Sequence, residues 1–287
     1  MIGIHNKKQQ FGLKFNSLKK SIEYSKNILG ATTSQIFTHN PRSSKLIKLN
    51  YTELINLNIP ISVHGCYIIN NVWSINNSNY KNKTKIIKLF LSEMKSAYNL
   101  NTNLVIHWPK KTLDEIYETM NILCILMKKN KLTNKIILEI PSVKQENNKT
   151  YHNPKDFNLL ANKLKKFNKY FVFCLDSAHL FSSGVHIESA EDVNKYLNKL
   201  NKYTISKIKY FHLNGCKTKF GSGKDTHSLA FNNDDNIWNI YKNDKKKSGF
   251  YLFAKFCKKN NINIILEIND NPPIDDIKNI ISYIKKI

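Results

Sequence analysis

The chain has 287 residues and a hydrophobic content of 41%, which suits one large domain with a full core. Its formal net charge of +24 favours a nucleic-acid partner, although an AT-rich coding genome would also enrich Lys, Asn, Ile and Tyr. The sequence has no apolar run of about 18 residues, no secretion signal and no paired cysteine spacing, which argues against a membrane protein, a secreted protein and a disulfide framework and favours a reducing, cytoplasmic compartment.

Short apolar or β-branched runs alternate with longer amphipathic or lysine-rich segments along the chain, which is the pattern of strands alternating with helices. The predicted strands are 2–5, 35–38, 60–64, 103–108, 135–140, 171–176, 207–213 and 262–268. The predicted helices are 16–29, 44–56, 79–99, 112–130, 154–168, 189–202, 246–260 and 274–286. Thr112 with Glu115, and Ser189 with Asp192, have the spacing of helix N-caps.

Eight strands, each followed by a helix, predict an α/β fold of the (β/α)8 TIM-barrel type. No Pro-, Gly- or Ser-rich linker divides the chain, and no repeat of 20–50 residues is visible beyond the β-α alternation. We therefore predict a single domain over residues 1–287.

Polar side chains that bind metals follow six of the eight predicted strands. In a barrel the carboxyl ends of the strands converge on one face, where active sites are built. The candidates are His64, His107, Glu139, Asp176, His179, His212, Asp225, His227 and Glu267. Five imidazoles and four carboxylates suit zinc, or less specifically manganese or iron, and exceed what one ion needs. A lone His or acid at a strand end is more often a core residue or a helix cap, but six such strand ends favour a cluster of two or three ions.

The remaining histidines and two cysteines carry weaker signals. His5 ends the first strand and fits a supporting role beside the ligands, whereas His39, His152 and His186 are predicted as loop or surface residues. Cys66 and Cys216 lie near ligand positions, and we interpret them as small packing residues rather than ligands of a soft metal.

Six motifs together resemble, in order and spacing, the endonuclease IV family of apurinic/apyrimidinic (AP) endonucleases, and look closest to its branch in large cytoplasmic DNA viruses. They read IPISVHGCYIIN, NLVIHWP, IILEIP, VFCLDSAHLFSSG, YFHLNGCKTKFGSGKDTHSL and NIILEIND. The resemblance implies three zinc ions, with manganese as an alternative occupant. It assigns His64, His107 and Glu139 to the first ion. A bridging Glu139 would join Asp176, His212 and Glu267 at the second, and His179, Asp225 and His227 would hold the third.

The resemblance also implies an activity on double-stranded DNA. The bond cut is the one 5′ to an abasic site, which leaves a 3′-hydroxyl and a 5′-deoxyribose phosphate, with trimming of blocked 3′ ends as a related activity. Glu139 and Glu267, with metal-bound water, would be the catalytic groups, because clustered zinc yields a nucleophilic water near neutral pH. We expect a monomer, and leave open whether it is packaged in a virion.

Recognition of an abasic nucleotide requires bent DNA and side chains that fill the gap. The resemblance points to Tyr67 and Ile68 as inserting and stacking residues, and to Arg42 as an arginine in the minor groove. Ordinary packing for Tyr67 and a solvated loop charge for Arg42 are the alternatives. The loop lysines Lys217, Lys219 and Lys224 would lie near the scissile phosphate.

Several segments depart from the family pattern, which leaves substrate preference open. The stretch AFNNDDNIW after HSL lacks the usual glycine, and His5-Asn6-Lys7-Lys8, the insert around Trp73 and residues 243–248 are unlike bacterial members. A metal-dependent sugar isomerase is one rival, but such enzymes favour carboxylate-rich sites with few imidazoles. A non-catalytic DNA-binding barrel is another, which the loss of a ligand would signal.

Overall fold

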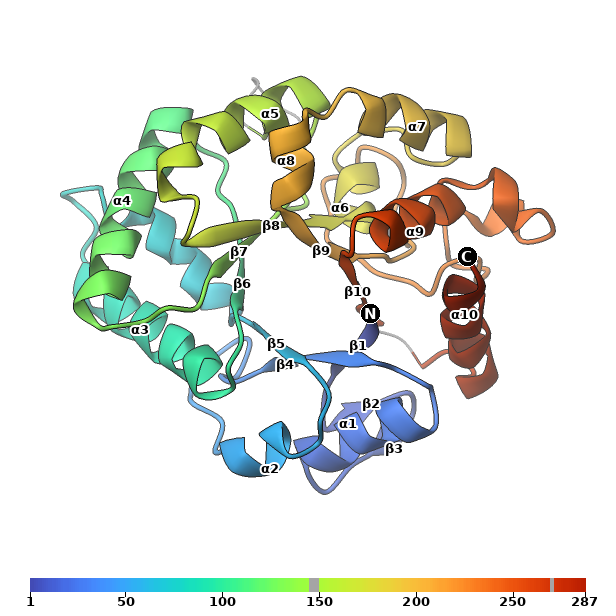
Figure 1. Cartoon of the computed structure of the whole chain (residues 1–287), viewed down its shortest axis with the longest axis horizontal. Helices are drawn as coiled ribbons and strands as arrows, with labels where there is room; N and C mark the ends of the chain where they lie inside the picture. Colours follow the sequence, from blue (N-terminus) through green and yellow to red (C-terminus); the bar gives the residue numbers. More distant parts are fainter. Residues whose placement is uncertain (145–149, 269–270) are drawn as a thin grey trace.

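Eight parallel strands close into a barrel in the computed structural model, which describes residues 1–144, 150–268 and 271–287 (Figure 1). The last two positions of the NIILEIND motif, 269 and 270, lie outside the described residues. The barrel strands are β1 (Ile2–Asn6), β4 (Thr33–Phe37), β5 (Ile61–His64), β6 (Leu104–His107), β7 (Ile136–Glu139), β8 (Phe171–Asp176), β9 (Ile208–His212) and β10 (Asn263–Leu266). The predicted TIM barrel is confirmed, and each strand lies within three residues of its predicted bounds.

The register of the strands brings their last residues to one level. His107 lies opposite Glu139, and Asp176 lies opposite His212. Because neighbouring parallel strands hold these positions by regular backbone hydrogen bonds, polar side chains from distant parts of the chain meet at one end of the barrel.

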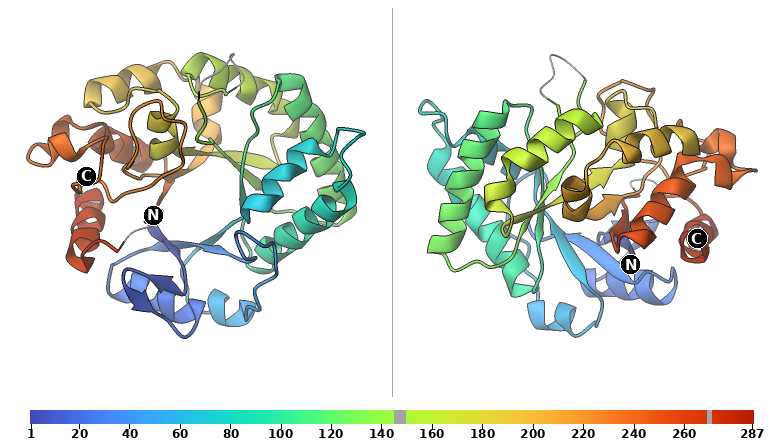
Figure 2. Two further views of the ribbon diagram at one scale, coloured as in Figure 1. Left: turned by 180° about the vertical axis from the view of Figure 1, so that it is seen from behind. Right: turned by 45° about the horizontal axis from the view of Figure 1, so that its top comes forward.

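Helices surround the barrel (Figures 1 and 2). The α-helices are α1 (Leu18–Asn27), α2 (Tyr51–Ile55), α3 (Lys83–Asn99), α4 (Leu113–Lys129), α5 (Pro154–Lys163), α6 (Ser177–Ser182), α7 (Ala190–Asn198), α8 (Lys202–Lys207), α9 (Gly249–Lys259) and α10 (Ile274–Lys286). The predicted caps of α4 and α7 are confirmed as capping boxes. None of these helices is long and apolar enough to cross a membrane.

Four predicted helices are wrong in extent. The segment 79–99 is helical only from Lys83, and 154–168 divides into α5 and a short 3-10 helix at Lys165–Phe167. The segment 44–56 forms only the five residues of α2, because Ser44 has a left-handed backbone (φ 55°) and Asn50 caps a later start. The segment 189–202 breaks into α7 and α8, since Asn201 caps a new helix by accepting from the Thr204 backbone N–H.

Short elements that no periodicity predicts occur in the connections between the strands and the main helices. They are the hairpin β2 (Gln9–Gln10) and β3 (Leu13–Lys14), the 3-10 helices η1 (Tyr67–Ser74), η2 (Lys165–Phe167), η3 (Asn239–Tyr241) and η4 (Lys245–Lys247), and α6. In the left view of Figure 2 the long loop that follows β9 lies on the side turned away from the viewer in Figure 1. This loop and η1 follow strand ends and frame the site described next.

Candidate metal centre

All nine predicted ligands lie at or just beyond the carboxyl ends of the barrel strands. Seven are buried, His107 is partly buried, and the Asp225 side chain is 44% exposed. A buried cluster of this many ionisable groups costs free energy unless the groups are paired or bind a cation. Within the described residues, three overlapping groups of them are close enough to hold a metal ion.

The first group is His64, His107 and Glu139. The Nε2 atoms of His64 and His107 lie 3.3 and 3.2 Å from Glu139 Oε2. His64 donates its Nδ1 proton to the Gly65 carbonyl at 2.8 Å, so Nε2 carries the lone pair that faces the carboxylate.

These separations fit ligands around an ion better than hydrogen bonds. Bonds of about 2.0–2.1 Å that meet at the tetrahedral angle place neighbouring ligand atoms of zinc about 3.3 Å apart. Glu139 Oε2 is buried without a hydrogen-bond partner, as are Nε2 of His179 and both ring nitrogens of His227. Orphaned lone pairs that point at one another are what a bound cation would satisfy.

The second group joins Glu139, Asp176, His212 and Glu267. The Nδ1 atom of His212 lies 2.9 Å from Glu139 Oε1, 3.5 Å from Glu267 Oε2 and 3.7 Å from Asp176 Oδ2. Glu139 therefore offers one oxygen to each group, which is the geometry of a bridging carboxylate.

The third group is Asp176, His179 and His227, at α6 and the loop after β9, and Asp225 lies beside it. Asp225 Oδ1 lies 3.1 Å from His179 Nε2 and 3.3 Å from His227 Nε2, and Asp176 Oδ2 lies 3.6 Å from His227 Nε2. His179 donates its Nδ1 proton to the Ile140 carbonyl at 2.7 Å, which leaves Nε2 free as a ligand atom. Asp176 also caps α6 through the His179 backbone N–H, so one carboxylate orients both the helix and the site.

Three further polar residues hold the ligands, and two of them escaped the sequence analysis. Gln35 on β4 accepts from His212 Nε2 at 3.1 Å and donates to Glu267 Oε1 at 2.5 Å, which leaves His212 Nδ1 to face the carboxylates. Asn214 donates to Asp176 at 2.9 Å and accepts from the Glu267 backbone N–H at 2.7 Å. His5 lies 2.8 Å from Glu267 Oε1, in the supporting position expected for it. The sequence signal for Gln35 was a polar amide residue within the barrel strand TSQIF, where a buried side chain needs a hydrogen-bond partner.

The buried carboxylates of the cluster need nearby positive charge to remain ionised. Burial raises the pKa of Glu139 and of Glu267, but the neighbouring imidazoles, His212 foremost, hold the pKa of both carboxyls well below its usual value. Burial lowers the pKa of His179, yet Asp176 and Asp225 raise it well above its usual value. The carboxylates are thus balanced only if imidazolium or a metal cation is present.

One of the proposed DNA-contacting residues, Tyr67, lines the pocket of the metal ligands, and Arg42 belongs to a loop that is hydrogen-bonded to it. Tyr67, at the start of η1, is 50% exposed and lines the same pocket as His64, His107 and Glu267. Its backbone N–H donates to the Pro41 carbonyl at 2.9 Å, which sets the exposed Arg42 loop beside it. Half-exposure does not fit packing under a loop, whereas Ile68 packs partly against the core.

The loop lysines Lys217, Lys219 and Lys224 are all exposed, and Lys217 lies 3.9 Å from Asp234. Lys7, which the sequence analysis did not single out, also lines the pocket of the metal ligands. Cys66 and Cys216 are buried free thiols, and burial raises the pKa of Cys66 to about 12, so both packing assignments agree with the structure.

Two histidines predicted as loop or surface residues do lie in loops, but they are buried rather than on the surface. His39 is 2% exposed and its Nδ1 lies 3.1 Å from the buried Glu93 Oε2, and His152 is 1% exposed with Nε2 2.6 Å from the Pro141 carbonyl. His186 is exposed as expected. Both buried histidines have polar neighbours in the sequence, which suggests exposure. In the structure, a buried carboxylate pairs with His39 and a backbone carbonyl accepts a hydrogen bond from His152.

Comparisons with known proteins bear on this site. No protein-family model matches the chain. A protein of African swine fever virus (isolate Warthog/Namibia/Wart80/1980) described as "Probable AP endonuclease" is 38% identical over 104 residues, 35% of this chain and 34% of the viral protein. The match thus spans about a third of the length of that relative. A protein of Thermosipho africanus described as "Probable endonuclease 4" is 30% identical over 215 residues, 69% of this chain and 73% of the relative.

Solved structures show the same fold. The crystal structure titled "AsfvAP:AG" superposes with a TM-score of 0.83 at 23% identity and covers 100% of this chain and 98% of that one. Endonuclease IV from Thermus thermophilus superposes with a TM-score of 0.73 at 18% identity, covering 100% and 99%. A D-tagatose 3-epimerase-like protein reaches 0.64 at 15% identity, covering 99% and 97%. The barrel is therefore shared with both endonucleases and sugar epimerases, and fold alone does not choose between them.

Proposed function

The chain belongs to the endonuclease IV family, and from that membership and the geometry of its metal centre we propose that it is a zinc-dependent AP endonuclease of DNA base excision repair. It hydrolyses the phosphodiester bond 5′ to an abasic site and leaves a 3′-hydroxyl and a 5′-deoxyribose phosphate, and it trims blocked 3′ ends. The observation that carries the proposal is Glu139, whose two oxygens face imidazoles of two different ligand groups.

The ligand sets proposed for three ions follow the three groups. His64, His107 and Glu139 hold the first, and Glu139, Asp176, His212 and Glu267 the second. His179, Asp225 and His227 hold the third, with Asp176 close by. Bound zinc would supply Lewis acidity toward the phosphate and a water that ionises near neutral pH.

The side chains around the centre prepare it for a phosphate. Gln35 and His5 fix Glu267 Oε1 by two hydrogen bonds, so that Oε2 is left to face His212 and His227. Lys7 adds a positive charge at the pocket wall, and burial lowers the pKa of this amine. Phe37 and Tyr67 line the same pocket as the metal ligands, where they would contact a sugar phosphate turned out of the duplex.

The sugar-isomerase alternative is less well supported by the donor set. Five imidazoles lie among the nine ligand candidates, and nitrogen donors favour zinc over the magnesium or manganese that oxygen-rich sites prefer. The non-catalytic alternative requires a missing ligand, and all nine side chains lie in the cluster.

A duplex oligonucleotide with one abasic analogue tests the proposal, without added magnesium. We expect a single cut 5′ to the lesion, and a loss of roughly 10³-fold or more in Glu267→Gln. Glu191→Gln, which alters an exposed ion pair on α7, is the matched control and should cut at the wild-type rate. Absence of the 5′ cut, or undiminished cutting by Glu267→Gln, would refute the assignment.

A further inference from the structure

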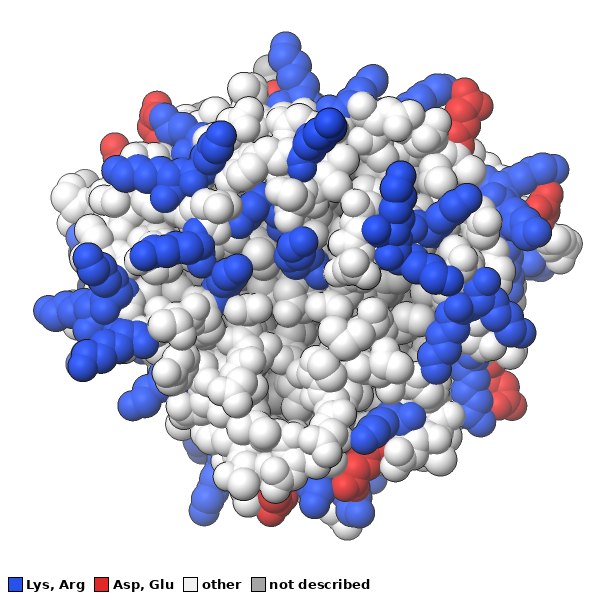
Figure 3. Space-filling model, viewed as in Figure 1, with Lys and Arg blue, Asp and Glu red and all other residues white. Residues whose placement is uncertain are grey.

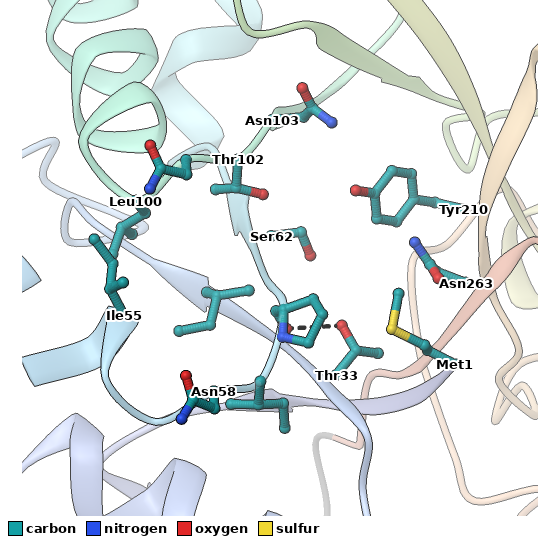
Figure 4. A pocket seen from close by; sticks show the side chains of 14 residues that line it. Met1, Thr33, Ile55, Asn58, Ser62, Leu100, Thr102, Asn103, Tyr210 and Asn263 are labelled. Carbon is teal, nitrogen blue, oxygen red and sulfur yellow. Dashed lines mark hydrogen bonds between the residues drawn. The ribbon is translucent and has the colours of Figure 1, made fainter.

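The face on which the barrel strands begin has a charge pattern of its own. Figure 3 shows Lys and Arg side chains over the upper half and both flanks of this face, around a hollow without charged side chains. The hollow is a cavity of about 580 Å³ whose wall includes Thr33, Asn58, Asn103 and Asn263, at or before strand starts, and Tyr210 within β9 (Figure 4). The metal centre lies at the opposite end of the same strands.

Carboxylates are absent from the chain segments that lead into four neighbouring strands. Residues 119–138, 157–175, 193–224 and 245–266, which contain the connections into β7, β8, β9 and β10, include no Asp or Glu, although the whole chain has 21. The acidic side chains instead lie mainly in first turns of helices and in the metal centre.

Lysines gather at the starts of β7, β8 and β9, which are adjacent in the barrel. We define the strand-start cluster as Lys131, Lys135, Lys169 and Lys209. The first, third and fourth are exposed and Lys135 is half-buried. None of the four forms an ion pair with a described carboxylate.

Two members of the cluster, Lys135 and Lys209, lie close to a fifth lysine, Lys207. Its Nζ donates to the Asn168 carbonyl at 2.7 Å and lies 4.5 Å from the centre of the Phe171 ring. Burial and the charges of Lys135 and Lys209 lower the pKa of Lys207 to about 8. Like charges are therefore held together here, and a polyanion would relieve their repulsion.

The helix macrodipole accounts for Lys131, directly after the C-cap of α4, but not for the other three lysines of the cluster. It favours lysines in the last turn of a helix, as in α4 and α9. Lys135, Lys169 and Lys209 instead lie beside or within strands, whose net dipole is small. An AT-rich gene would enrich lysine throughout the chain. That enrichment alone does not explain why the four segments leading into β7, β8, β9 and β10 contain no Asp or Glu.

We propose that the strand-start cluster is a second DNA-contacting surface, which binds the phosphate backbone of duplex DNA on the face opposite the metal centre. The clustered ammonium groups and the lack of carboxylates suit a phosphate backbone, because such contacts need charge and no base-specific pattern. The neutral amides and hydroxyls of the adjacent hollow add hydrogen-bonding groups without repelling phosphate.

The proposal is tested by counting duplexes per chain. With an uncleavable abasic-analogue duplex saturating the metal face, wild-type protein should take up a second, undamaged duplex in analytical ultracentrifugation at low salt. The variant Lys131→Gln, Lys135→Gln, Lys169→Gln, Lys209→Gln should lose this second event. In a variant that changes only one of these lysines to Gln, the slope of log affinity against log salt concentration for the second duplex should be shallower by up to about 0.9.

The matched control removes the same charge elsewhere. Lys20→Gln, Lys195→Gln, Lys247→Gln and Lys278→Gln alter four lysines that already pair with carboxylates, and the second duplex should still bind. A charge-conserving variant with Arg at the four cluster positions should bind like wild type, which separates charge from folding. A wild-type protein that takes only one duplex, or equal effects in both Gln variants, would overturn the proposal.

Discussion

The two ends of the barrel strands differ in chemistry although the same strands connect them. On β9, Lys209 is exposed near the start and His212 is fully buried at the end. At the strand ends, carboxylates and imidazoles are buried within 4 Å of one another. At the strand starts, lysine side chains are exposed to solvent. Water screens the exposed lysines, whereas the buried groups depend on ligand geometry. Both ends carry many charged groups, but only the strand ends bury most of theirs. Burial, rather than the number of charged residues, therefore distinguishes the metal centre from the opposite face.

The largest expected effect comes from Glu139→Gln, which would disrupt the metal centre at the strand ends and leave the strand-start cluster unchanged. One bridging oxygen would be replaced by an amide, so we expect loss of bound metal and a fall in incision of roughly 10³-fold or more. Single-turnover incision and metal analysis measure both. The cluster variant with Gln at four strand-start lysines is the opposing control, and it should keep single-turnover incision of saturating substrate.

Gln35→Met should have a smaller effect on the same face. The side chain keeps its size but loses its hydrogen bonds to His212 and Glu267, and losing such a supporting contact costs about 10–100-fold in metal affinity or activity. Metal dissociation measured by chelator competition is the readout, since a merely structural role would leave it unchanged. Gln9→Met, at an exposed position of β2, is the matched control. Equal metal affinity in the two variants would disprove the positioning role.

Glu93→Gln should separate DNA binding from chemistry. The buried Glu93 on α3 accepts from the Cys66 backbone N–H and the Thr38 hydroxyl, each at 2.9 Å, and pairs with His39. It thereby ties the loop of Arg42 to the loop of Tyr67. Burial raises its pKa, but the hydrogen bond and charge of His39, together with the hydrogen bonds from Cys66 and Thr38, keep the pKa below its usual value.

For Glu93→Gln we expect a roughly 10- to 100-fold rise in KM for an abasic duplex with little change in kcat, since a lost charged hydrogen bond is worth about 1.5–3 kcal/mol. Steady-state incision kinetics give both constants, and Glu53→Gln, on α2, is the control. A fall in kcat with unchanged KM would place Glu93 in the chemistry and contradict the loop role.

The smallest effect concerns Asp235, which holds the loop after β9. It accepts from the backbone N–H groups of Phe231, Ile237 and Cys216 at 2.8, 2.9 and 3.2 Å. Burial nevertheless raises its pKa to about 6. The unfolded carboxyl, with a pKa near 3.9, loses its proton first, so the folded state binds more protons between about pH 4 and 6. This group therefore lowers the free energy of unfolding as pH rises through that window.

Asp235→Asn removes that titration. The free energy of unfolding of wild type relative to the variant should fall by up to about 2–3 kcal/mol from pH 4 to pH 7, measured by urea unfolding at each pH. The difference between the two proteins cancels titration of the metal ligands, which they share. A pH-independent difference would show that the three backbone donors fully offset the burial of Asp235.

The barrel and the nine ligand candidates were predictable because strand periodicity places each ligand at a strand end. Gln35 and Asn214 were not, since nothing in one sequence shows that their amides turn toward His212 and Asp176. His39 was missed because its partner Glu93 lies 54 positions away on a helix. The strand-start cluster also escaped prediction, because lysines spread over the sequence gather only when β7, β8 and β9 pair.

Metal analysis of protein purified without added metal tests the central claim most directly, since three overlapping groups of buried ligands have meaning only with ions between them. Mass spectrometry of the intact, incision-active protein should find about three zinc ions per chain, and fewer in Glu139→Gln. An active protein that carries no transition metal would contradict the account.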